Sequence, residues 1–192
     1  SEREAMRDFQ QLFEALFVAH QLRMDAAWLQ EALGQAERRA LIDPLTQLWN
    51  RQGLRAMLPA LLSRAEREAL QVAFIYGDLD HFKRINDEHG HAAGDQLLAR
   101  VAGRLREVVM AQVSAGTGDA VIGRLAGDEF TMFFPFLPGP SAAARIARAV
   151  QFALSERFDL GSQHVELGAS IGIACYPDHG DTLSALLRAT DV

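Results

Sequence analysis

The apolar residues of the first forty positions recur at helical spacing. From Arg3 to Leu41 they return every three or four residues without a proline, which predicts one long helix. Two consecutive three-residue steps around Ala19 interrupt an otherwise heptad seam. Such a seam is buried only against another helix, so the pattern favours a parallel coiled coil of two copies; folding back onto the same chain is the alternative. The seam residues are Phe9, Leu12, Leu16, Ala19, Leu22, Ala26, Leu29, Leu33, Ala36 and Ala40.

Beyond the long helix, shorter apolar runs predict alternating helices and strands. Asp43 precedes Pro44 and is therefore kept out of the α region, which places a boundary at about residue 42. The predicted domains are a helical segment, residues 1–42, and a folded domain, residues 43–192. Strands are expected at 72–76, within 164–175 and in a hairpin at 120–134, and helices at 51–67, after residue 95 to about 111, at 141–157 and from 182 onward. The fold class is therefore α/β, an α+β sandwich with antiparallel strands in a central sheet.

Two pairs of acidic residues stand at predicted turns. Asp128 and Glu129 lie at the tip of the hairpin, inside the short link of residues 124–130. Asp78 and Asp80 follow the first apolar strand. Carboxylates a few ångströms apart gather divalent cations, because like charges do not both stay ionised without one. A plain polar turn is the alternative reading of the hairpin tip taken alone.

Composition excludes several classes of protein. The 19 basic and 25 acidic residues give a net charge of -6 without a Lys/Arg run, so nucleic acid is not an expected partner. The single cysteine, Cys175, excludes an internal disulfide, is expected to be buried, and fits a cytoplasmic setting. No apolar stretch approaches the ~20 residues of a membrane helix, so no membrane segment is expected in this chain. Three neighbouring histidines, His81, His89 and His91, lack the spacing of a zinc site.

Several separate stretches together resemble the GGDEF domain of diguanylate cyclases. They are residues 43–51, residues 78–95, the hairpin residues 124–130 and residues 169–174, and the resemblance covers about residues 41–192. The order and spacing of these stretches along the chain support the resemblance, whereas an acidic tripeptide alone would be weak evidence for it. The resemblance implies an α/β sandwich similar to the palm of polymerases and nucleotide cyclases.

The resemblance also implies a reaction. Diguanylate cyclases condense two GTP molecules into cyclic di-GMP and two pyrophosphates, with each 3′-hydroxyl attacking the other α-phosphate across a homodimer. Mg²⁺ or Mn²⁺, two ions per active half-site, would be held by Asp78, the carbonyl of Leu79 and Asp128. Asp128 would also take the hydroxyl proton, with Lys83 and Glu129 as further catalytic residues. For Glu129 a structural hydrogen bond stays open, because strand alternation turns it away from Asp128.

By the same resemblance, GTP would be bound through its guanine by Asn86 and Asp95, in a pocket shaped by Phe82 and His91. A carboxylate at Asp95 can accept from both the ring N–H and the exocyclic amine of guanine, a pattern that adenine does not offer. Lys83 would supply positive charge near the phosphates. A sensor domain preceding residue 1 would act through the long helix.

Ala126 replaces the first glycine of the family signature. In a type I′ turn both central residues need positive φ, where alanine costs on the order of 1 kcal/mol relative to glycine. The substitution Ala126→Gly is therefore expected to keep or raise activity. The alternative function is a degenerate GGDEF domain that binds GTP and regulates a partner domain without turnover; a purely structural dimerisation module leaves the polar residues unexplained.

Two further departures concern ligand contacts. The family's inhibitory Arg-x-x-Asp site for cyclic di-GMP would fall on Thr117 and Ala120, so that site is expected to be absent. The last helix of the family continues to a Lys and an Arg that reach the triphosphate, and the sequence up to Val192 does not include them. Both departures concern binding strength rather than fold.

Overall fold

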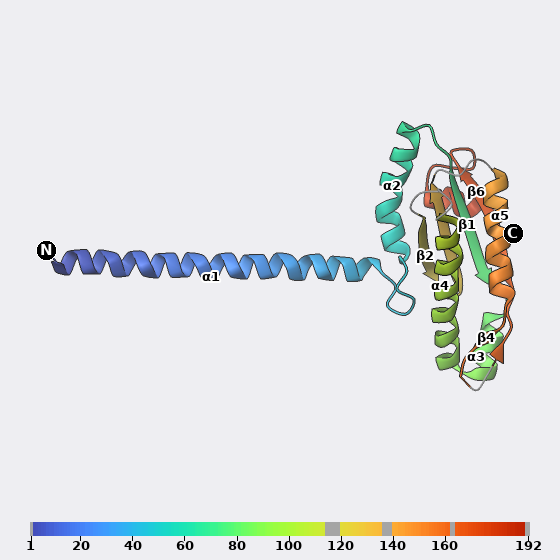
Figure 1. The fold of residues 1–192 in the computed structure, drawn as a ribbon, viewed down its shortest axis with the longest axis horizontal. Helices are drawn as coiled ribbons and strands as arrows, with labels where there is room; N and C mark the ends of the chain where they lie inside the picture. Colours follow the sequence, from blue (N-terminus) through green and yellow to red (C-terminus); the bar gives the residue numbers. More distant parts are fainter. Residues whose placement is uncertain (1, 114–119, 136–139, 162–163, 191–192) are drawn as a thin grey trace. The chain divides into compact units, whose positions relative to one another are not determined.

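The long N-terminal helix forms a unit of its own. The computed structural model describes residues 2–113, 120–135, 140–161 and 164–190, and the chain divides into units of residues 1–40 and 41–192. Helix α1 (Glu2–Leu41) is continuous, as its apolar spacing predicts (Figure 1). Four leucines of the seam are 58 to 63% exposed, which leaves an unpartnered apolar stripe. They are Leu16, Leu22, Leu29 and Leu33.

The second unit is built on a four-stranded antiparallel sheet with the order β2-β3-β1-β6. Its strands are β1 (Val72–Leu79), β2 (Val121–Ala126), β3 (Glu129–Pro135) and β6 (Ala169–Tyr176). A small ribbon of β4 (Phe158–Asp159) and β5 (His164–Val165) lies apart from this sheet. The predicted hairpin is confirmed as β2 and β3, and the central strand β1 pairs with both β3 and β6.

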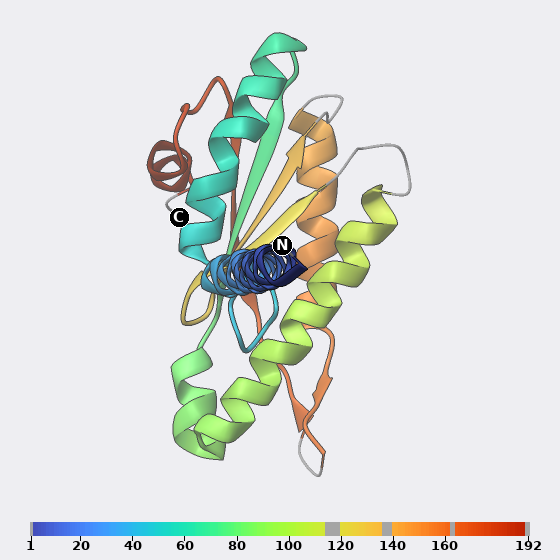
Figure 2. The same ribbon diagram turned by 90° about the vertical axis from the view of Figure 1, so that its left-hand side faces the viewer.

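Helices cover both faces of the sheet (Figure 2). One face packs against α4 (His91–Val113) and α5 (Pro140–Ser155), and the other packs against α2 (Arg51–Arg67) and α6 (Leu183–Ala189). Alternation along β1 sends Ile75 to the first face and Phe74 to the second, where Phe74 contacts Phe133 at a centroid distance of 4.8 Å. The three layers confirm the predicted α/β sandwich. Cys175 is buried, as expected, and burial raises the pKa of its thiol.

The segment after β1 is more helical than the sequence pattern indicated. Residues Phe82–His89 form helix α3, and α4 already begins at His91 rather than after residue 95. Gly90 separates the two helices with a φ of 85°, a conformation that glycine adopts without steric cost. Only Ile85 of α3 is buried, so the segment has no apolar periodicity that could have predicted a helix.

The loop that opens the second unit is bonded to the β2–β3 hairpin. The backbone N–H of Trp49 donates to the carbonyl of Ile122 at 3.2 Å, and the backbone N–H of Arg124 donates to the carbonyl of Trp49 at 2.8 Å. One guanidinium nitrogen of Arg124 also lies 3.1 Å from both carboxylate oxygens of Asp43. Burial acts to raise the pKa of Asp43, but hydrogen bonds from Thr46 and from Arg124 outweigh it and lower that pKa.

The Arg124→Met variant is expected to lower the free energy of unfolding by about 3 kcal/mol at pH 7, because it strands a largely buried Asp43 carboxylate. The lowered pKa means that this carboxylate stabilises the fold above its unfolded pKa of about 3.9. The contribution is lost as the pH falls through the lowered folded-state pKa, so the difference between parent and variant should shrink there. Urea denaturation at pH 7 and pH 3 measures both effects. Arg55→Met, at an exposed position, is the matched control; an equal loss there would refute the ion pair's role.

Candidate active site

The hairpin tip is a tight turn with Gly127 and Asp128 at its centre. Ala126 pairs with Glu129, and a register shift between Arg124 and Ala126 marks a β-bulge just before the turn. Gly127 has a φ of 46°, whereas neither Ala126 nor Asp128 has a positive φ. The hairpin turn is therefore present but is not of type I′, and Ala126 does not carry the strain expected of it, because it lies in the strand after the bulge. Arg124 fixes the turn by donating from Nε to the carbonyl of Gly127 at 2.9 Å.

The acidic tip lies beside the end of β1. Asp78 pairs directly with Glu129, and the backbone N–H of Leu79 donates to the carbonyl of Asp128 at 3.3 Å. Burial raises the pKa of Asp78, and the neighbouring charges of Asp128, Glu129 and Asp80 raise it further. The structure thus brings Asp78, Leu79, Asp128 and Glu129 together from strands that lie some fifty residues apart in sequence.

Glu129 is also held from the side of α2. Its Oε1 accepts a hydrogen bond of 3.1 Å from the Tyr76 hydroxyl, and its Oε2 lies 3.7 Å from a guanidinium nitrogen of Arg51. Burial and the charge of Glu129 together raise the pKa of the Tyr76 phenol, which stays protonated and donates. The sequence pattern identified neither Tyr76 nor Arg51 as a partner of Glu129. The structural hydrogen bond considered for Glu129 from the sequence is present, with Tyr76 as its donor.

Asp80, whose charge also acts on Asp78, has structural partners of its own. Its Oδ1 accepts a hydrogen bond of 2.8 Å from the Ser170 hydroxyl, and its backbone N–H donates to the carbonyl of Gly168 at 3.0 Å. A methyl group at Gly168 would overlap the Asp80 carboxylate. These contacts join the end of β1 to the start of β6, a role that the sequence pattern did not indicate.

Helices α3 and α4, which follow β1, carry a second group of polar residues. Asp80 and His81 alone separate β1 from α3. The amide oxygen of Asn86 and the ring of Phe82 both lie against Gly94 of α4, so closely that a methyl group there would overlap the Asn86 amide. Asn86 therefore packs against Gly94, the residue that precedes Asp95.

The remaining candidate residues lie at the surface of this region. Lys83 on α3 and His91 at the first position of α4 are exposed, as is Asp95, while Phe82 and Asn86 are half-buried. Phe82 also packs against the core formed with α4. The structure thus offers exposed polar groups beside a half-buried ring and amide, which suits a planar polar ligand.

The donor atoms at the tip suit a hard cation. Carboxylate and carbonyl oxygens are the ligands that Mg²⁺ and Mn²⁺ take, and Mg²⁺ is usually held by one or two carboxylates plus phosphate oxygens of its substrate. Within the described residues no three histidine, cysteine, aspartate or glutamate side chains are already gathered as a ready-made metal site. Asp78 and Asp128 therefore fit a cation that shares its coordination with a bound ligand.

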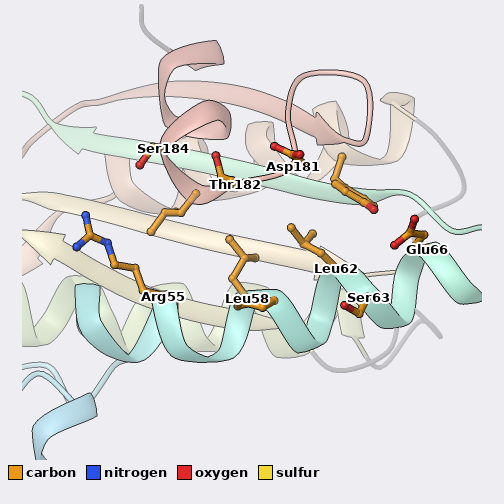
Figure 3. A pocket seen from close by; sticks show the side chains of 11 residues that line it. Arg55, Leu58, Leu62, Ser63, Glu66, Asp181, Thr182 and Ser184 are labelled. Atoms are coloured by element: carbon orange, nitrogen blue, oxygen red, sulfur yellow. The ribbon is translucent and has the colours of Figure 1, made fainter.

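A pocket of about 520 Å³ lies elsewhere, between α2 and α6 (Figure 3). Arg55 lines one end of it and Glu66 the other, with Leu58 and Leu62 between them. Tyr176, which also lines this pocket, pairs with Val72 at the start of β1, at the opposite end of that strand from Asp78. This pocket is separate from the candidate active site.

Comparison with known proteins identifies the family. Residues 40–192 match the family described as "Diguanylate cyclase, GGDEF domain". Diguanylate cyclase TpbB of Pseudomonas aeruginosa is 35% identical over 167 residues, which are 86% of this chain and 37% of TpbB. The chain spans between 18% and 37% of the length of the first curated relatives. This chain belongs to the GGDEF domain family of diguanylate cyclases.

Two solved structures support the same conclusion. A sensory box/GGDEF family protein from Caulobacter crescentus is 38% identical, with a TM-score of 0.69 over 79% of this chain and 93% of that one. The coiled coil and GGDEF domain of DgcB from Caulobacter crescentus, in complex with c-di-GMP, is 26% identical. It has a TM-score of 0.74 and covers 87% of this chain and 85% of its own. In the described part of this chain no helix is both long and apolar enough to span a membrane.

Proposed function

We propose that this chain is a diguanylate cyclase module that condenses two GTP molecules into cyclic di-GMP and two pyrophosphates. The observation that carries the proposal is the meeting of Asp78, Asp128 and Glu129 at the hairpin tip, with the half-buried Asn86 on α3, the helix that follows β1. Family membership supports this reading, and the reaction requires both a carboxylate cluster and a purine site.

One group of residues would bind GTP and another would bind the metal ions. Asn86 and Asp95 would hydrogen-bond the guanine, with Phe82 and His91 shaping its pocket and Lys83 near the phosphates. Asp78, the carbonyl of Leu79 and Asp128 would hold Mg²⁺ or Mn²⁺, two ions per half-site, which when bound stabilise the charge that develops on the phosphoryl oxygens.

In each half-reaction the 3′-oxygen of one GTP would form a bond to the α-phosphorus of the other, while the bond to pyrophosphate breaks. Asp128 would accept the proton of the attacking hydroxyl, and its position beside Asp78 supports this role. Two such steps close the cyclic product, so both protomers of a dimer are required.

The test is to incubate the protein with GTP and Mg²⁺ and to quantify cyclic di-GMP and pyrophosphate. For every two GTP consumed, one cyclic di-GMP and two pyrophosphates are expected, and no product is expected in EDTA. GTP binding without any product, in this chain and in a longer one, would favour the regulatory alternative. The structure weakens one argument for that alternative, since Ala126 is exposed and its φ is not positive.

Dimerisation through α1 is a second part of the proposal, supported by the exposed leucines of its seam. The double variant Leu22→Asp and Leu29→Asp is expected to sediment as a monomer and to lose at least tenfold in activity at micromolar concentration, because two charges enter the seam. His20→Asp with Ala27→Asp, on the other side of the helix, is the control. Equal sedimentation of both double variants would refute this seam. If α1 does pair in this way, a sensor domain before residue 1 would control the pairing of the two helices.

A further inference from the structure

The carboxylate of Glu129 is held at both of its oxygens by residues from two elements. The Tyr76 hydroxyl, from β1, donates to Oε1 at 3.1 Å, and the Arg51 guanidinium, from the first residue of α2, lies 3.7 Å from Oε2. Tyr76 lies outside every stretch that carries the resemblance to diguanylate cyclases. The resemblance thus assigns no role to Tyr76 and does not account for its contact with Glu129.

Strand geometry places this pair of contacts beside Asp78. Asp78 and Glu129 are directly paired across β1 and β3, so their Cβ atoms lie on one face, about 5 Å apart. Tyr76 precedes Asp78 by two residues and shares that face. Like charges in directly paired positions destabilise a sheet. The hydrogen bond from Tyr76 and the charge of Arg51 offset that repulsion and hold the Glu129 side chain in place.

We infer that Tyr76 is a positioning residue whose hydroxyl holds Glu129 toward Asp78, across the site of a divalent cation. A carboxylate oxygen that accepts one hydrogen bond keeps a lone pair for a cation. Hydrogen-bond partners of this kind orient metal ligands, and removing one typically weakens metal binding or activity by about 10- to 100-fold. The inference rests on the proposed function, since the cation is expected to bind together with GTP.

The test uses Tyr76→Phe, which removes only the hydroxyl, and Mn²⁺ as the probe. Mn²⁺ is titrated into the whole chain with the α,β-methylene analogue of GTP, which does not react, and free Mn²⁺ is measured by electron paramagnetic resonance. Tyr176→Phe is the matched control, because Tyr176 is the only other tyrosine and pairs with Val72 at the far end of β1. We expect about tenfold weaker Mn²⁺ binding in Tyr76→Phe and no change in Tyr176→Phe.

Activity adds a second readout. In Tyr76→Phe the Mg²⁺ concentration for half-maximal product formation should rise about tenfold, while KM for GTP at saturating Mg²⁺ stays unchanged. Equal Mn²⁺ affinity in Tyr76→Phe and the parent, an equal loss in Tyr176→Phe, or a parent that binds no Mn²⁺ would each overturn the inference. A parent that binds Mn²⁺ but makes no cyclic di-GMP would refute the proposed function alone. If circular dichroism shows that Tyr76→Phe is unfolded, Arg51→Gln replaces it, and unchanged Mn²⁺ affinity there would overturn the inference.

Discussion

The Asp128→Asn variant is expected to form cyclic di-GMP at least a hundredfold more slowly than the parent, roughly the contribution of a positioned general base. Asparagine keeps the size of the side chain but neither accepts the hydroxyl proton nor carries the charge that attracts a cation. The backbone should be unaffected, because the turn is held through the carbonyls of Gly127 and Asp128. Product formation from GTP and Mg²⁺, measured by chromatography, gives the rate.

The Asp128→Asn variant is also expected to change the pKa of Asp78. Removing the charge of Asp128 takes away one of the charges that raise the pKa of Asp78, so that pKa should fall toward its ordinary value. Asp178→Asn is the control, since Asp178 is exposed and follows Tyr176 at the other end of the sheet. Full activity in Asp128→Asn would remove Asp128 from the chemistry and leave Asp78 and Glu129 as the remaining carboxylates.

The Gly94→Ala variant is expected to weaken GTP binding at least tenfold. The added methyl would overlap the Asn86 amide oxygen and crowd the Phe82 ring, so both would have to move away from the expected guanine position. A misplaced hydrogen-bonding group in a site built for a polar ligand costs more than a lost apolar contact. Fluorescence titration with a labelled, non-reacting GTP analogue measures the dissociation constant.

Gly103→Ala is the matched control for Gly94→Ala, because Gly103 lies in the same helix α4 and a methyl group there would meet nothing within 4 Å. This control should bind GTP as the parent does and gain up to about 1 kcal/mol in stability from helix propensity. Unchanged GTP affinity in Gly94→Ala would show that Asn86 and Phe82 do not contact the nucleotide.

Much of the fold could be predicted from the sequence, because the pattern of apolar and polar residues within one segment indicates whether that segment is a helix, a strand or a hairpin. The spacing of α1, the apolar run of β1 and the hairpin are each visible within a few dozen residues. The polar helix α3 was missed, since Ile85 alone is buried in it. Strain at Ala126 was expected but is absent, because a β-bulge shifts the register after Arg124, and the turn sequence alone does not show the pairing that creates this bulge.

The candidate site was predictable in its residue types but not in its contacts. Asp78 and Asp128 could be placed at the ends of a strand and a hairpin, although only the tertiary fold shows that these ends meet. Tyr76 is 53 residues away from Glu129 and reads as one more apolar position of β1. Asp80 could be read only as a second acidic residue after the strand, because its contact with Ser170 depends on the pairing of β1 with β6, 90 residues later.

Arg124 contacts both Asp43, near the start of the folded unit, and the carbonyl of Gly127 in the turn that carries Asp128. Together with the backbone bonds of Trp49, these contacts join the entry loop to the hairpin. We therefore expect a displacement of Asp43 to move the turn that carries Asp128, because the Arg124 side chain contacts both. Position at the entry of the folded unit would in this way be coupled to the position of the acidic tip.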